Sequence, residues 1–192
     1  MAAVRAQPVA HELRMAAETA LVKLYENRDK ARVHTDSLPY MEFAGLRLDM
    51  LGMKSQFVKE IDDFYWDAVQ NPTARQRVGH DLGEITGTNA RLQDLRDTTT
   101  RLEQKYRELW LQENRPYWLR NVTIRYEVLA QEFQQKINAL ASSRGRQGVL
   151  PKPEEIGFFH IEAQPAASQQ PQQAPQPGSA QPPATPAKPP ES

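Results

Sequence analysis

The chain has 192 residues, in which 24 basic and 24 acidic side chains cancel, and it contains no cysteine. This length accommodates one ordinary domain with a tail. The balanced and interleaved charge provides no basic field, so neither nucleic acid nor anionic lipid is an expected partner. The lack of cysteine excludes disulfides and thiolate chemistry, and it fits a reducing or an oxidising compartment.

No apolar run approaches the roughly 20 residues that cross a bilayer, so we expect a soluble protein without membrane contact. Residues 1–12 lack the basic stretch followed by an apolar stretch that marks a secretory signal. If the reading frame is complete, we expect the chain to stay where it is made, in the cytoplasm.

The first helix is predicted over residues 8–32. Its apolar residues recur with three-four spacing and form one stripe, as in an amphipathic helix that packs on a core. The next helix has a start signal, because Asp36 or Ser37 can accept free amides of the following turn and Pro39 suits its first positions. The stripe of the first helix consists of Leu13, Ala16, Ala17, Ala20, Leu21 and Leu24.

The second helix, predicted over residues 38–70, is the richest in apolar residues. Its apolar positions cover more than half of the helical wheel, on two neighbouring sides. So wide an apolar arc contacts more than one neighbour, so we place this helix at the centre. Gly45 and Gly52 indicate either the close approach of another backbone or a partly exposed helix. One side carries Phe43, Leu46, Met50, Met53, Phe57, Ile61, Phe64 and Ala68, and the other Met41, Ala44, Leu48, Leu51, Val58 and Tyr65.

A short helix, either weak or kinked, is predicted over residues 75–86. Two stronger helical patterns follow between residues 89 and 140, separated by the sequence Glu-Asn-Arg-Pro at 113–116. The proline ends the first of these helices and opens the second, which predicts an antiparallel hairpin. The two stripes are Leu92, Leu95, Thr99, Leu102, Tyr106 and Leu109, and then Leu119, Val122, Tyr126, Leu129, Phe133, Ile137 and Leu140.

The character of the sequence changes near the C-terminus. Residues 149–163 form a short extended, apolar segment, in which the alternation of Phe159 and Ile161 allows one short strand, packed on the bundle or on a partner. Residues 164–192 are almost entirely Pro, Gln, Ala and Ser, which predicts a disordered tail. The sequence therefore predicts an all-α fold, an antiparallel helical bundle of three long helices plus a short weak helix over residues 8–148, with a disordered Pro/Gln-rich C-terminal tail.

The common motifs of enzymes are missing from this sequence. It has no glycine-rich phosphate loop, no G-x-S-x-G or H-E-x-x-H sequence and no cysteine pair. The histidines fall one to a segment, so we predict no metal site. From the missing motifs we also predict no cofactor and no catalytic residue. Adjacent side chains on a helix point about 100° apart, so we interpret Asp62, Asp63 and Asp67, and likewise Glu154 and Glu155, as a solvated face.

Three large aromatic residues gather at the predicted hairpin corner, and Trp66 lies elsewhere. Trp110 is near the end of the first hairpin helix, and Tyr117 and Trp118 open the second. They either plug one end of the bundle or dock onto another domain. In the second case Arg115 is a fork that holds a carbonyl or a carboxylate. Trp110, Arg115, Tyr117 and Trp118 are therefore the candidate docking surface.

The sequence Glu-Leu-Trp-Leu-Gln-Glu-Asn-Arg-Pro at residues 108–116, with the helix that follows, resembles the C-terminal helical region of bacterial β-N-acetylhexosaminidases of glycoside hydrolase family 20. Residues 41–68, with the pattern Phe-Ala-x-x-Arg-Leu-Asp-x-Leu-Gly, look similar to the helices that precede that region. The resemblance covers roughly residues 10 to 160.

In such enzymes an adjacent Asp-Glu pair in an upstream (β/α)8 barrel assists the acetamido group of the substrate. This chain has no Asp-Glu dipeptide and no strand-helix alternation of the length that a barrel needs, about 250 residues. The resemblance therefore implies a non-catalytic accessory region, a fragment or split part of a hexosaminidase-like enzyme that acts on N-acetylhexosamine-containing glycans. Its partner would be the catalytic barrel domain, and the parent enzyme would be exported. The alternative is a free-standing helical-bundle interaction or scaffold protein with a proline-rich tail.

Overall fold

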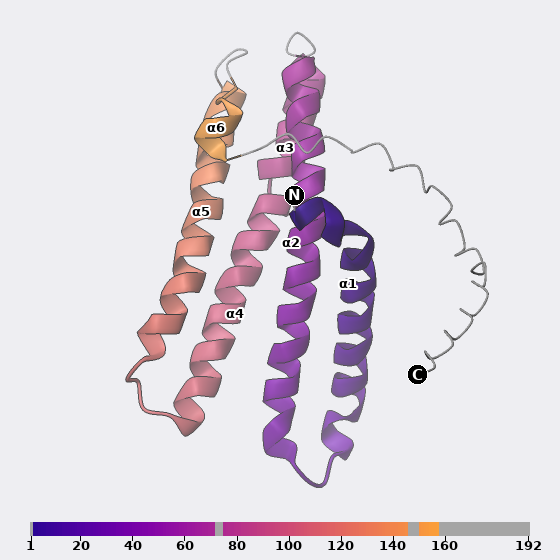
Figure 1. The fold of residues 1–192 in the computed structure, drawn as a ribbon, viewed down its shortest axis with the longest axis vertical. Coiled ribbons are helices and arrows are strands. Elements are labelled where there is room, and N and C mark those ends of the chain that lie inside the picture. Colours follow the sequence, from indigo (N-terminus) through magenta and orange to yellow (C-terminus); the bar gives the residue numbers. More distant parts are fainter. Residues whose placement is uncertain (1, 72–74, 146–149, 158–192) are drawn as a thin grey trace, which may run out of the picture. The chain divides into compact units, whose positions relative to one another are not determined.

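The computed structural model describes residues 2–71, 75–145 and 150–157, and all regular elements in these ranges are helices (Figure 1). The predicted all-α antiparallel bundle is therefore confirmed. None of the described helices is both long and apolar enough to cross a membrane. The helices are α1 (Ala2–Asn27), α2 (Leu38–Gln70), α3 (Arg75–Thr86), α4 (Arg91–Glu113), α5 (Leu119–Gly145) and α6 (Pro153–Ile156), with 3-10 turns at Arg28–Lys30 and Thr35–Ser37.

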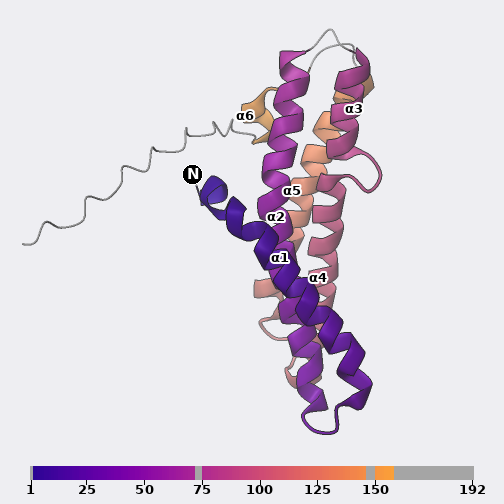
Figure 2. The ribbon, with the colours of Figure 1, turned by 90° about the vertical axis from the view of Figure 1, so that its right-hand side faces the viewer.

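The long helix α2 is the central element. It forms one antiparallel hairpin with α1, while α4 and α5 form a second hairpin (Figures 1 and 2). Helices α3 and α4 follow one another along α2, so that α2 packs against α1, α3 and α4. This arrangement explains why the apolar arc of α2 is so wide, since three helices cover different parts of it.

The hydrophobic core lies between α2 and the group α3, α4 and α5. Its residues include members of both stripes predicted for the hairpin, which meet in this one cluster. Within the described residues, α1 contributes no side chain to this cluster. The cluster consists of Met50, Ile61, Tyr65, Leu82, Ile85, Leu92, Leu95, Leu102, Phe133, Ile137, Leu140 and Ile156.

Helix α1 packs on α2 at two glycines. Atoms of α1 occupy the space that a Cβ atom would need at Gly45 and Gly52. The close approach of another backbone is confirmed at Gly52, where the oxygen of Ala10 is near, whereas at Gly45 the side chain of Leu21 fills this space. The stripe predicted for α1 is only partly covered, because Ala17 is buried whereas Ala16 and Ala20 are exposed. Helix α1 is thus attached to one neighbour rather than embedded in the core.

Helix α2 begins at Leu38, as predicted, but without a side-chain cap. Ser37 occupies the cap position and makes no side-chain hydrogen bond to the helix. The prediction that Asp36 or Ser37 caps α2 is wrong because the preceding 3-10 turn offers a backbone acceptor instead. The amide of Leu38 donates to the carbonyl oxygen of Thr35, and Pro39 has no amide hydrogen to satisfy.

The described chain returns to the bundle over residues 150–157. The hydroxyl of buried Tyr65 donates a hydrogen bond of 2.6 Å to the carbonyl oxygen of Pro151. The ammonium of Lys136 donates to the carbonyl oxygen of Ile156, whose side chain is buried in the core. This segment is therefore bonded to α2 through Tyr65 and to α5 through Lys136, and its Ile156 is part of the core.

One helical turn, α6, occupies Pro153–Ile156, where the sequence suggests extended backbone. Gly157 follows it with a φ of 68°, the left-handed conformation that ends helices and favours glycine. The predicted strand at Phe159 and Ile161 and the predicted disordered tail over residues 164–192 lie outside the described residues.

Candidate functional site

The carboxylates of α2 do not form an acid/base pair. Asp62 is buried, 6% exposed, and accepts a hydrogen bond of 3.0 Å from the indole Nε1 of Trp66. Asp63 points to solvent, where its Oδ1 lies 2.8 Å from Nζ of Lys59. The interpretation as a solvated face is therefore correct for Asp63 and wrong for Asp62. The neighbouring Ile61 is buried as well, so this turn of α2 is covered over more than one side.

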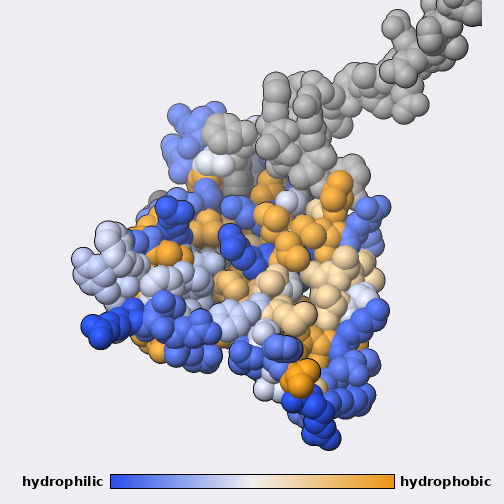
Figure 3. Space-filling model, turned by 60° about the horizontal axis from the view of Figure 1, so that its bottom comes forward, coloured by the Kyte–Doolittle hydropathy of each residue, from blue (hydrophilic) through white to orange (hydrophobic). Residues whose placement is uncertain are grey.

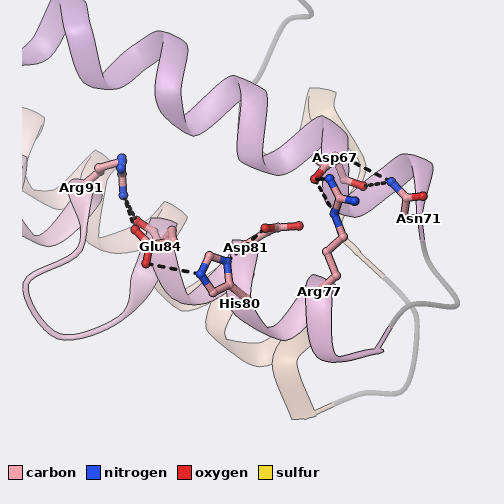
Figure 4. Close-up of polar contacts among 7 residues, drawn as sticks. All are labelled: Asp67, Asn71, Arg77, His80, Asp81, Glu84 and Arg91. Carbon is pink, nitrogen blue, oxygen red and sulfur yellow. Dashed lines mark hydrogen bonds and ion pairs between the residues drawn. The ribbon is translucent and has the colours of Figure 1, made fainter.

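Sequence reasoning missed a cluster at His80, Asp81 and Glu84 of α3 (Figure 4). The Nδ1 atom of His80 lies 3.3 Å from Oδ1 of Asp81, and its Nε2 atom lies 4.0 Å from Oε1 of Glu84. The i, i+1, i+4 spacing on one helix was the signal that could have found it. However, the side chain of His80 is 68% exposed, so nothing encloses a substrate against it. The geometry does not make an acid/base site.

Two arginines connect this region to its neighbours (Figure 4). Arg77 of α3 donates from Nε to Oδ2 of Asp67 in α2 at 2.8 Å. Arg91 of α4 donates to Glu84 and to Glu60 of α2, each at 2.7 Å, and so joins three helices. These ion pairs hold helix ends together. Among the described residues, no group of three or more acidic or histidine side chains is placed to hold a metal ion.

A second charged contact lies at Glu42 of α2. Its carboxylate accepts hydrogen bonds from Nζ of Lys105 in α4 at 3.0 Å and from the hydroxyl of Tyr25 in α1 at 3.2 Å, and Arg28 lies 3.7 Å away. Burial alone would raise the pKa of Glu42, but the hydrogen bond and charge of Lys105, with Tyr25 and Arg28, lower it below its ordinary value. This carboxylate therefore links α1, α2 and α4 in its ionised form.

The structure separates the four residues of the candidate docking surface into two kinds. Trp110 is half-buried, packs against Tyr106 with ring centroids 6.0 Å apart, and donates from its indole Nε1 to the carbonyl oxygen of Arg115 at 2.8 Å. Tyr117 and Trp118, in contrast, are 74% and 61% exposed. Their rings meet edge to face, with centroids 5.2 Å apart. Trp110 thus packs within the corner, whereas the side chains of Tyr117 and Trp118 are exposed to solvent.

The backbone at Trp118 explains this presentation. Trp118 has a φ of 68°, in the left-handed region that few residues other than glycine adopt. The prediction that Pro116 opens the second hairpin helix is wrong for this reason: a residue with positive φ cannot continue a helix, and α5 begins only at Leu119. The left-handed turn directs two successive aromatic side chains outward. The sequence contains no glycine at this position that would indicate such a turn.

In the described part of the chain, the side chain of Arg115 is free at the corner, but the residues around it are tied to the bundle. The guanidinium of Arg115 is exposed and has no carboxylate partner among the described residues. Beside it, a hydrogen bond to Glu113 raises the pKa of Tyr40 above its ordinary value of 10.0. This contact ties the end of α4 to the start of α2. The aromatic corner, Tyr117 and Trp118 with Arg115, therefore projects from a fixed base.

Comparison of the chain with protein-family models, with curated proteins and with solved structures finds no match. The resemblance to the helical region of hexosaminidases stays a prediction, as does the catalytic barrel as a partner.

Proposed function

We propose that this chain is a non-catalytic helical interaction module, which binds a partner protein through the aromatic corner. The observation that carries this proposal is the exposure of Tyr117 and Trp118, at 74% and 61%, on a strained left-handed turn. A bundle of amphipathic helices supplies a rigid base, and the corner supplies the contact.

The energetics favour a binding role for these two aromatic residues over a packing role. Leaving a large apolar side chain in water forgoes about 1.5–3 kcal/mol of stability relative to burying it. Holding a non-glycine residue such as Trp118 in the left-handed region costs about 1–2 kcal/mol more. Among the described residues, the ring contact that the structure gives these two side chains is the one that they make with each other. A partner that covers them would recover the first term.

The chemistry of the corner matches that of binding hot spots, which are rich in Trp, Tyr and Arg. Each aromatic ring offers a large apolar area with few rotatable bonds and one polar atom, so little entropy is lost on binding. Arg115 adds a planar donor fork for a carbonyl or carboxylate of the partner. Because its own backbone carbonyl is fixed by Trp110, the base of this fork is already ordered.

The accessory role in a hexosaminidase-like enzyme is one particular form of this function, with a catalytic barrel as the partner. It rests on the resemblance at residues 108–116, which includes part of the same corner. No further contact among the described residues favours a barrel over another partner, so a purified family 20 barrel is one arm of the experiment.

The test compares the wild-type chain with the double variant Tyr117→Ser/Trp118→Gly and with Val33→Ser as a matched control. Val33 is 74% exposed, as Tyr117 is, but lies in the turn between α1 and α2. Immobilised chains are used for quantitative capture from an extract of the source organism, and in parallel against a purified family 20 barrel. We expect the same captured protein with wild type and Val33→Ser, and its loss with the double variant. Unchanged capture by the double variant, or loss of its helical circular dichroism, would refute the proposal.

A further inference from the structure

A second surface, separate from the aromatic corner, runs along α2. An apolar groove of about 810 Å³ lies between α1 and α2. Figure 3 shows the hydrophobic residues gathered on the side of the molecule where α1 and α2 lie. The groove has an almost wholly apolar floor, formed mainly by Leu13, Ala17, Leu21, Leu24, Met41 and Leu48.

A second groove, of about 880 Å³, lies on the other side of α2, between α2, α4 and α5. The two grooves share Ala44 and Leu48, so one exposed ridge of α2 separates them. On this ridge Met41, Leu48 and Leu51 are 60%, 46% and 54% exposed. The ridge residues Met41, Ala44, Leu48 and Leu51 recur at three-four-three spacing, which is the seam that one helix offers to another.

The rims of both grooves carry one sign of charge. Lys23 and Lys30 line the first groove and Arg47, Lys54 and Arg125 line the second, and neither groove is lined by Asp or Glu. In the part of the chain that the structure describes, these five cations form no ion pair, whereas most other cations do. In a chain without net charge, this segregation gives the ridge a positive border.

We propose that this ridge and its two grooves bind an amphipathic helix of a partner protein, whose apolar stripe is flanked by Asp and Glu. The inference rests on the proposed function, binding rather than catalysis, and adds the chemical class of a partner. The apolar seam accepts leucine-like side chains at helical spacing, and the cationic borders select acidic flanks.

Other occupants fit less well. An extended segment would bring unpaired backbone amides and carbonyls against an apolar helical surface, which has no free backbone groups to receive them. A second copy of this chain, docked about a two-fold axis on the same ridge, would place the five cations of each copy opposite those of the other. Like charges at such an interface oppose association.

The experiment uses two fluorescent synthetic peptides of about 18 residues, or five helical turns. Both carry Leu at three-four spacing, and they differ only in having Glu or Lys at the flanking positions. Each is titrated into the full-length chain at about 0.15 M ionic strength, where distant charges are screened, and the fluorescence anisotropy is measured. We expect saturable binding of the Glu peptide, roughly tenfold or more tighter than that of the Lys peptide.

Variants locate the site. We expect Leu48→Glu to weaken binding of the Glu peptide by roughly tenfold or more. Met41→Glu is a second ridge variant with the same expected effect, for use if Leu48→Glu does not fold. Val22→Glu is the matched control, since Val22 is 47% exposed on α1 and lines neither groove, and its affinity stays that of wild type. The double variant Lys23→Glu/Arg47→Glu shifts the preference toward the Lys peptide.

Equal affinity for the two peptides, or wild-type affinity of both folded ridge variants, would overturn the inference. A wild-type dimer in sedimentation that Leu48→Glu converts to a monomer would assign the ridge to a second copy of the chain instead. The variant Tyr117→Ser/Trp118→Gly must bind the Glu peptide as wild type does. Failure of the ridge and failure of the aromatic corner are therefore distinguishable.

Discussion

The backbone oxygen of Ala10 in α1 lies 2.8 Å from the position that a Cβ atom on Gly52 of α2 would occupy. At Gly45 the nearest atom to such a Cβ is Cδ2 of Leu21, also at 2.8 Å. At Gly52 the Cγ atom of Arg14 lies closer still, at 2.5 Å, but the Ala10 oxygen belongs to the backbone, whereas the atoms near Gly45 all belong to the side chain of Leu21. The two glycines therefore permit the same helix crossing but differ in how much room a substitution can find.

This difference predicts unequal effects of alanine. We expect Gly52→Ala to lower the free energy of unfolding by about 1–3 kcal/mol, because α1 must shift as a whole. Gly45→Ala should cost less, since Leu21 can change rotamer. Gly79→Ala, where nothing lies within 4 Å, should stabilise α3 by about 0.5–1 kcal/mol. Urea unfolding of the three variants measures the order, and an equal effect at Gly45 and Gly52 would contradict it.

Trp118 offers a test of backbone strain. Trp118→Gly should leave the free energy of unfolding unchanged or raise it by about 1 kcal/mol, because glycine adopts the positive φ freely and the ring is exposed. Trp118→Ala, which removes the ring but keeps a Cβ atom, is the control for the backbone term. Thermal unfolding separates them. A loss of about 3–5 kcal/mol in both variants would instead identify a buried structural tryptophan.

Tyr65 anchors the segment that follows α5. Tyr65→Phe should destabilise the protein by about 1–3 kcal/mol, because the half-buried carbonyl of Pro151 loses the hydroxyl that donates to it at 2.6 Å. Amide exchange of residues 150–157 should rise more than that of α4. Uniform acceleration across all helices would show that the hydroxyl acts on the core rather than on this segment.

The lowered pKa of Glu42 predicts that the folded protein loses stability in acid. Its lowered pKa means that the folded chain prefers the carboxylate, so as the pH falls the unfolded chain binds this proton first. The stabilisation is therefore complete above the ordinary value of 4.5 and is lost as the pH falls through the lowered pKa. Glu42→Gln should reduce the fall in melting temperature between about pH 5 and about pH 3. An unchanged pH profile in this variant would contradict the assignment.

The isolated chain should not hydrolyse an aryl N-acetylglucosaminide. It has no Asp-Glu dipeptide, and its adjacent acids Asp62 and Asp63 lie in different environments, one buried and one in solvent. Two carboxyl groups must flank one glycosidic bond for acid and base to act together. A colorimetric assay of the purified chain measures this, and turnover that disappears on replacing a single carboxylate would refute the expectation.

The helices were predictable because their signals are local. The bounds of α2, Leu38–Gln70, agree with those expected from the apolar pattern and the flanking proline and asparagine signals. The hairpin stripes are likewise visible in the sequence, since Leu95, Leu102 and Leu140 are all buried. Local spacing determines which residues share a face, and that information is complete within each helix.

The covered side of α2 was not predictable, because it depends on where other helices lie. Met50 and Ile61 are buried in the core, whereas Met41 and Leu51 are exposed on the ridge, although all four are apolar. The same limit applies to the candidate site. Sequence spacing brings Trp110 and Trp118 to one corner. The left-handed turn at Trp118, which leaves this residue exposed while Trp110 is half-buried, is a conformation of the folded backbone.

Helix α1 contributes no residue to the core cluster of the described chain, and its contacts are made chiefly with α2. Helices held by few buried side chains open locally with less free energy than global unfolding requires. Amides of α1 should then exchange with solvent through a partial opening that leaves α4 and α5 closed. A ligand that contacts both walls of the groove between α1 and α2 would therefore first slow amide hydrogen exchange along α1. This slowing would report binding even without a change of structure.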